Sequence, residues 1–137
     1  MLVKTIKFKD FNGNERSRDY YFNLSKSEIT KMNLSKTGGL ENWLARVTNA
    51  DDYGTLYNLF EELVSNSYGV ISEDGISFIK TKELSERFIQ SNAFEAMFIE
   101  FMSDTNKAIE FFKGIMPADL VSKLPADAFN KITAENK

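Results

Sequence analysis

The stretch FKDFNGNERSRDYYFNLSKSE, residues 8–28, predicts a strand, a tight turn, a second strand and the start of a helix. Ile6 and Phe8 lie on one face of the first strand and Thr5, Lys7 and Lys9 on the other, because side chains in a strand alternate with a period of two. Asn12-Gly13 is typical of a two-residue type I′ turn. After the turn, one parity carries Arg16, Arg18, Tyr20, Phe22 and Leu24. The stretch therefore predicts an antiparallel β-hairpin.

The hairpin is followed by helical patterns. Ser25 and Glu28 have the spacing of a capping box, which begins a helix that we expect to end near Leu34. Apolar residues at helical spacing predict further helices around 40–47, from 51 or 52 to a stop at Gly69, over 81–90, from an Asn92 cap, and from an Asp104 cap to Pro117. The segment VISEDGISFIK, residues 70–80, predicts a second, smaller hairpin with its turn at Glu73-Asp74-Gly75.

These elements indicate an α+β fold, with the N-terminal hairpin and the smaller hairpin packed on a bundle of about six helices. The length of 137 residues, with 42% hydrophobic and 27% charged residues, is typical of one globular domain. Within this single domain, 1–137, we expect the hairpin over 1–24, a mostly helical part over 25–117, and a short helix with a frayed tail over 118–137.

Composition disfavours several functions. The sequence has no cysteine and no histidine, which removes disulfides, thiol nucleophiles and the commonest general base and metal ligand. We therefore expect neither an enzyme nor a cofactor or metal site. A net charge of −3 disfavours nucleic acid as a partner. No apolar run is long enough for a membrane span, and charges interrupt the N-terminal MLVKTIKFK, so we expect a cytoplasmic protein without a signal peptide.

Three short motifs have a weak functional interpretation and a stronger structural one. Glu61-Glu62 and Asp51-Asp52 are adjacent carboxylates, but neighbours on a helix diverge, and the aspartates are better explained as helix caps. Ser72–Gly75 has acidic residues without the ligand spacing of a calcium loop. Thr37-Gly38-Gly39 lacks the spacing of a phosphate-binding loop, so a loop and cap are the better interpretation.

The least ordinary feature is a set of aromatic and methionine side chains in the last helices. With twelve phenylalanines in the chain, these residues fill more than one helix face. They are either core or an exposed surface that binds a partner helix. The candidate partner-binding residues are Phe94, Met97, Phe98, Phe101, Met102, Phe111 and Phe112.

The ordered segments KTIKFKDFNGNERSRDYYFNLSKSEI, GGLENWL, SYGV, DGISFIK, ELSERF, AFEAMFIEFMSD and FFKGIMP resemble the tail assembly chaperones of long-tailed, siphovirus-type bacteriophages and prophages of Gram-positive bacteria. The resemblance covers roughly residues 4–117.

This resemblance implies a non-enzymatic helper in the host cytoplasm that is not part of the mature virion. It would bind the tape measure protein and keep it soluble until tail tube subunits polymerise around it, with the tail tube protein as a further partner. The family is often made in a short form and in a longer, frameshifted form. Self-association, through the edge of the hairpin, is a second expectation.

Two other readings stay open at the level of sequence. One is a small phage or bacterial interaction module with another partner, such as a tail completion or regulatory protein. The other is a carboxylate-dependent enzyme, for which Glu61, Glu62, Asp74 or Glu100 would have to converge in a cleft.

Overall fold

The computed structural model describes residues 1–32, 42, 46 and 53–119. Along the chain the elements are β1 (Leu2–Lys9), β2 (Glu15–Phe22), α1 (Lys26–Lys31), α3 (Tyr53–Ser67), β3 (Tyr68–Ile71), β4 (Phe78–Ile79), α4 (Lys82–Ile89), α5 (Asn92–Ser103) and α6 (Thr105–Ile115). The predicted α+β class is confirmed, with four strands and five helices among the described residues. Apart from residues 42 and 46, the helix expected around 40–47 lies outside the described residues, and so does the expected tail from residue 120 on.

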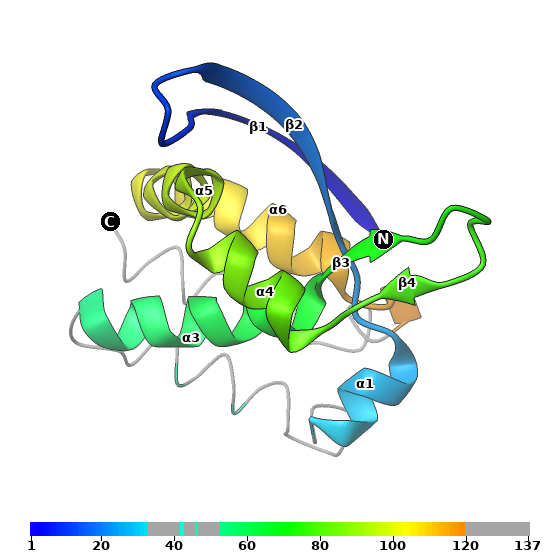
Figure 1. Ribbon diagram of the computed structural model, residues 1–137. Helices are drawn as coiled ribbons and strands as arrows, with labels where there is room; N and C mark the ends of the chain where they lie inside the picture. Colours follow the sequence, from blue (N-terminus) through cyan, green and yellow to red (C-terminus); the bar gives the residue numbers. More distant parts are fainter. Residues whose placement is uncertain (33–41, 43–45, 47–52, 120–137) are drawn as a thin grey trace.

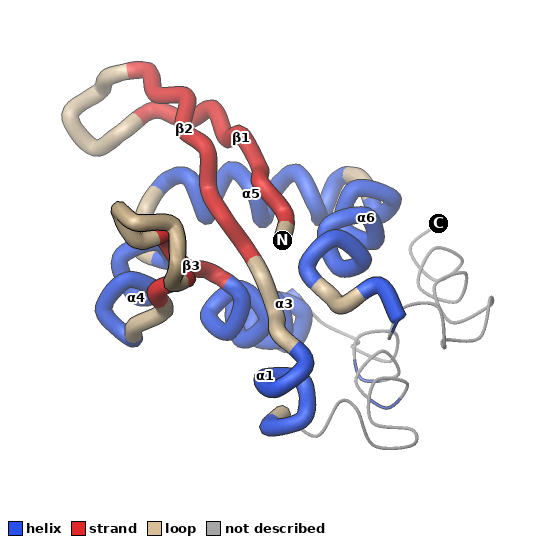
Figure 2. The backbone as a smooth tube through the Cα atoms, turned by 90° about the vertical axis from the view of Figure 1, so that its right-hand side faces the viewer, coloured by secondary structure: helices blue, strands red, loops and turns tan. Residues whose placement is uncertain are grey.

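The four strands form one antiparallel sheet in the order β1-β2-β3-β4. β1 and β2 pair along their full length, from Leu2–Phe22 to Lys9–Glu15. This hairpin arches over α5, while α3 and α4 lie beneath (Figure 1). Seen from the side, α5 lies along the hairpin, α3 and α4 lie near β3, and α1 follows the end of β2 (Figure 2).

The turn between β1 and β2 differs from the predicted two-residue type I′ turn. The N–H of Gly13 donates to the carbonyl of Asp10 at 3.0 Å, and the N–H of Asp10 donates to the carbonyl of Asn14 at 2.9 Å. Phe11 and Asn12 are therefore the central residues of the turn, and Gly13, at φ +85°, takes the left-handed position of a three-residue loop. The Asp10 carboxylate favours this loop, since its Oδ1 accepts the N–H groups of Asn12 and Asn14.

The N-termini of the helices are capped by side chains, largely as the sequence predicted. The capping box of α1 is confirmed: Ser25 Oγ accepts the N–H of Glu28, and Glu28 Oε1 accepts the N–H of Ser25. The cap of α5 is one residue earlier than predicted, because Ser91 Oγ, and not Asn92, accepts the N–H of Phe94. The Asn92 amide instead donates to the carbonyl of Lys9 at the end of β1. Asp104 caps α6 as predicted.

The sequence predicted that Gly69 ends a helix. In the structure it lies instead within β3. A Cβ atom there would come within 2.7 Å of Phe78 Cε2 and 2.8 Å of the Ile79 carbonyl oxygen on β4. The glycine is needed for close approach of the two strands. The smaller hairpin is confirmed, and its turn uses Gly75 at φ +76°.

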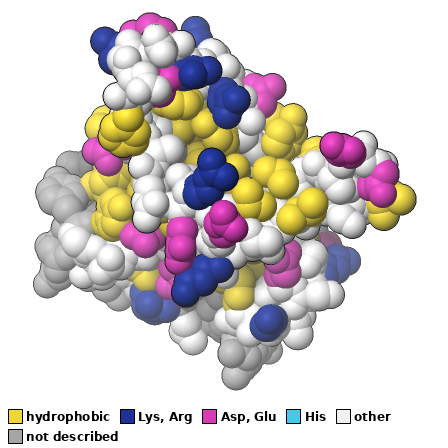
Figure 3. All heavy atoms as spheres, viewed as in Figure 1, with side chains coloured by type: hydrophobic (Ala, Val, Ile, Leu, Met, Phe, Trp, Pro, Cys, Tyr) yellow, Lys and Arg dark blue, Asp and Glu magenta, His cyan; other side chains and the backbone are white. Residues whose placement is uncertain are grey.

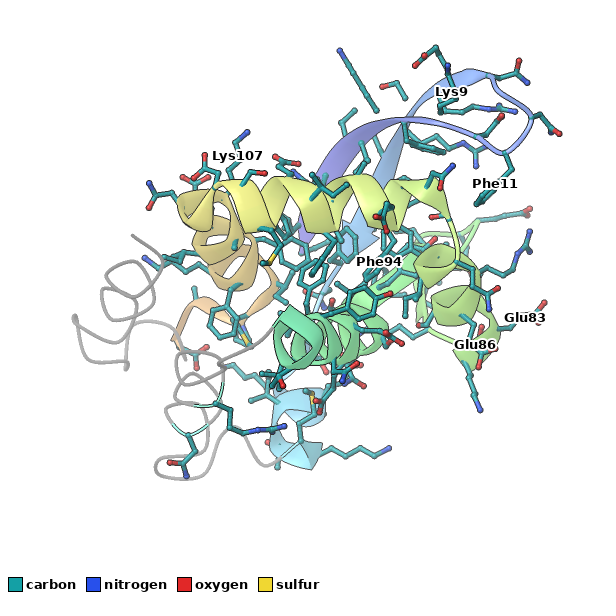
Figure 4. The ribbon with its side chains drawn as sticks, turned by 90° about the vertical axis from the view of Figure 1, so that its left-hand side faces the viewer. Lys9, Phe11, Glu83, Glu86, Phe94 and Lys107 are labelled. Atoms are coloured by element: carbon teal, nitrogen blue, oxygen red, sulfur yellow. The ribbon has the colours of Figure 1, made fainter. Side chains whose placement is uncertain are left out.

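The core lies between the inner face of the sheet and the helices. Phe22 of β2 is fully buried and its ring centroid lies 5.1 Å from that of Phe111, 5.7 Å from Phe88 and 5.8 Å from Tyr68. Phe94 points from α5 into the space above α3 (Figure 4), where its ring stacks on Phe60 at 5.5 Å. Aromatic rings therefore connect strands and helices in one continuous cluster.

Candidate binding surfaces

Most of the aromatic and methionine residues singled out in the sequence lie in the core. Phe94, Met97 and Phe101 on α5 and Phe111 and Phe112 on α6 are all buried, with exposed fractions of 7% or less. Phe98 and Met102 differ from them. Phe98 is half-buried against Tyr57 and Phe60 of α3, with ring centroids 5.1 Å and 5.7 Å away, and Met102 is 37% exposed.

The exposed side of α5 is apolar in its C-terminal half. Met102 lies four positions after Phe98 and three after Ile99, so it neighbours both of them on the helix surface. Ile99 is 55% exposed. We call these three residues the α5 stripe. The sequence pattern FIEF already placed apolar groups on more than one face of this helix, but it did not single out Ile99.

The other short motifs are structural. Glu62 on α3 is exposed, and its main-chain carbonyl accepts the amide of Asn66. Ser72–Gly75 is the turn of the small hairpin, where Asp74 Oδ1 accepts the Ser72 hydroxyl at 2.6 Å, a bond that lowers the pKa of Asp74. Within the described residues, no three side chains of the metal-binding types lie close enough together to hold an ion. Thr37–Gly39 and Asp51-Asp52 lie outside the description.

A further feature of the surface is a wedge-shaped gap where β2 and β3 separate. The ladder between them consists of Tyr21–Gly69 and Phe22–Tyr68. Beyond Tyr21 the strands diverge and leave a cavity of about 450 Å³. We call it the β2–β3 wedge; it is lined by Arg18, Asp19, Tyr20, Tyr21, Tyr68, Gly69, Val70 and Ile71. Apolar side chains gather on the face between the two hairpins (Figure 3).

Arg18, Tyr20 and Tyr68 are among the residues of this wedge whose side chains can carry a charge or donate a hydrogen bond. Burial raises the pKa of Tyr20, whereas the charge of the neighbouring Arg18 acts in the opposite direction. Burial and the neighbouring Tyr20 also raise the pKa of Tyr68, whereas the charges of Arg18 and Arg87 act in the opposite direction. Among the residues that the structure describes, no carboxylate lies within ion-pair distance of Arg18 or Arg87.

No helix in the described part of the chain has the length and apolarity that crossing a membrane requires. Comparison with curated proteins finds no match, and neither does comparison with solved structures. A family model described as phage tail assembly chaperone matches residues 1–137, the whole chain, and agrees with the resemblance carried by the hairpin and the segments after it. The chain thus belongs to the phage tail assembly chaperone family.

Proposed function

We propose that this protein binds the tape measure protein of its phage in the host cytoplasm, keeps it soluble, and holds it ready for polymerisation of the tail tube. Membership of the tail assembly chaperone family supports a role in tail assembly. The observation that supports client binding is the α5 stripe, where Ile99 and Met102 are 55% and 37% exposed on an otherwise well-packed helix. Flexible methionine and aliphatic side chains of this kind bind apolar stripes on partner helices.

The same proposal covers the setting of the protein. It acts without catalysis, in a siphovirus-type phage or prophage, and is not retained in the mature virion. The tail tube protein is its second partner. The alternative is an interaction module with another partner, and gene order separates the two: a tail assembly chaperone gene lies between those for the tail tube protein and a very large tape measure protein.

The test is co-expression of the wild-type chain with the tape measure protein of the same genome. We expect the tape measure protein to stay in the soluble fraction and to co-purify. An insoluble tape measure protein that never co-purifies with the wild-type chain contradicts the proposed function.

Variants then test the surface. Ile99→Asp and Met102→Asp place a charge in the α5 stripe, and each should weaken co-purification while the fold is kept. Ile76→Asp is the matched control, because Ile76 is 83% exposed at the tip of the small hairpin and receives the same change. If the α5 variants bind as well as this control, the client binds elsewhere.

Self-association is a separate part of the proposal. β1 is the edge strand of the sheet, and an edge strand can pair with another chain. Light scattering over a range of concentrations tests it, and a mass equal to one chain at every concentration contradicts it.

A further inference from the structure

The edge of β2 that faces the β2–β3 wedge has main-chain groups available for another strand. The N–H of Asn23 donates to the carbonyl of Ser67 at 2.8 Å, so the main-chain groups of Asn23 point toward β3. Because these groups alternate in direction along a strand, those of Tyr21, Asp19 and Ser17 point the same way. Only Tyr21 has a ladder partner on β3. The groups of Ser17 and Asp19 therefore face the wedge.

We propose that this edge is a docking site for an extended, acidic segment of a partner protein, which adds to the sheet beside β2. The site is distinct from the α5 stripe. Addition of a strand to an exposed sheet edge supplies affinity through main-chain hydrogen bonds and specificity through alternate side chains. Arg18 determines the specificity here, because it lines the wedge, and the residue opposite it on the added strand would lie beside its guanidinium group.

A carboxylate suits that position best. Arg18 lines the wedge and has no ion-pair partner among the described residues. The neighbouring charged residues of β2 already have partners. Arg16 Nε donates to Asp10 Oδ2 at 2.7 Å, and the Thr5 hydroxyl donates to Asp19. A carboxylate opposite Arg18 would form charge-assisted, bidentate hydrogen bonds with its guanidinium group.

A second copy of this chain does not supply that group. When two β2 strands pair about a two-fold axis, the side chains of opposed residues lie on the same face of the sheet. A pairing centred on Arg18 therefore places Arg18 opposite Arg18 of the other copy. A pairing centred on Ser17 places Arg16 opposite Arg18 of the other copy. Like charges directly opposite destabilise a pair of strands. β1 of another copy would present Leu2, Lys4, Ile6 and Phe8 on the helix side, none of them acidic. The occupant is therefore a different, acidic chain.

The test uses isotope-labelled protein and a capped octapeptide of alternating valine and glutamate, titrated to millimolar concentration and followed by amide NMR. We expect shifts at residues 15–21 and 69–71, and slower hydrogen exchange at the Ser17 and Asp19 amides. Arg18→Glu should weaken binding about tenfold or more, since it replaces attraction with repulsion. Lys7→Glu is the matched control: it makes the same charge change on the opposite face, at the residue that pairs with Ser17.

A main-chain test separates strand addition from simple charge attraction. Ser17→Pro removes an N–H that faces the wedge, whereas Lys7→Pro removes one at the other edge of the same hairpin, on the same rung. Only the first should abolish the peptide shifts; if it fails to fold, hydrogen exchange of the wild-type amides decides. The proposal is overturned if the glutamate peptide leaves these amides unchanged, or if a peptide of alternating valine and lysine binds equally well. None of these outcomes depends on the tape measure protein.

Discussion

Lys80 Nζ lies 2.6 Å from Glu28 Oε2, and this ion pair joins parts of the chain that are far apart in sequence. The same ammonium group donates to the carbonyl oxygens of Asn23, just after β2, and Asn66, near the end of α3. The other oxygen of Glu28 accepts the N–H of Ser25 in the capping box. One half-buried lysine thereby holds α1 against the end of the sheet and α3.

We predict that Lys80→Met lowers the free energy of unfolding by about 1–3 kcal/mol, because it leaves a partly buried carboxylate and two carbonyl groups without their charged donor. The lysine side chain is only 17% exposed, so water replaces it poorly. Urea denaturation followed by circular dichroism measures the change.

Lys82→Met provides the matched control. Lys82 is 90% exposed and lies 3.8 Å from Glu86 one turn along α4, a pair whose loss should change stability by about 0.5 kcal/mol or less. Equal losses for the two variants would contradict the role assigned to Lys80.

Stability should also depend on the charge of Glu28. Burial acts to raise its pKa, but hydrogen bonds from Lys80 and from the Ser25 N–H outweigh this effect and hold the pKa below the ordinary glutamate value of 4.5. A carboxyl group with a lowered pKa in the folded state stabilises the protein above its unfolded pKa, and this contribution is lost as the pH falls through the folded value. We predict that wild type is more stable than Glu28→Gln at neutral pH and that the difference shrinks on acidification below about pH 4.5. Urea denaturation of both proteins across this range measures it, and a constant difference would contradict the prediction.

Local signals predicted the elements of this fold well. The alternation before and after residues 10–14 predicted the long hairpin, and Ser25–Glu28 predicted the start of α1, because both depend on residues close in sequence. The turn was wrong in detail because the Asp10 side chain hydrogen-bonds the N–H groups of the loop and favours three residues over two. Gly69 was wrongly predicted as a helix stop, because the residue that requires a glycine there, Phe78, lies on another strand and is not adjacent in the sequence.

The surfaces were less predictable than the elements. A helical period shows that Phe94, Met97 and Phe101 share a face, but not whether another element covers that face, and here α3 and the sheet do. The wedge had no sequence signal, since it results from a two-rung pairing between β2 and β3, segments about fifty residues apart. Local sequence patterns do not show which strands far apart in the sequence will pair.

We predict that Gly69→Ala destabilises the protein by about 1–3 kcal/mol, the usual cost of overpacking. The added methyl would meet the carbonyl oxygen of Ile79 at 2.8 Å, and a main-chain atom cannot move aside without opening the β3–β4 pair. Gly114→Ala is the comparison. Its Cβ would lie 3.0 Å from Leu2 Cδ1, the end of a flexible side chain, and alanine favours a helix over glycine by about 1 kcal/mol. Thermal denaturation should show a clear loss for the first variant and little change for the second, and the reverse order would contradict the packing of Gly69.

Alanine substitutions on α5 should lower the free energy of unfolding by amounts that follow the burial of each side chain. Phe101 is 7% exposed and its ring centroid lies 5.1 Å from that of Phe111 and 5.5 Å from that of Phe60. Phe101→Ala should therefore cost about 3–5 kcal/mol through the cavity it leaves. Met102→Ala should cost about 1 kcal/mol or less, because its side chain is partly in water already, and Phe98→Ala should fall between them. Urea denaturation of the three variants gives the order. If Met102→Ala were as costly as Phe101→Ala, the methionine would be part of the core, and the α5 stripe would lose one of its two exposed residues.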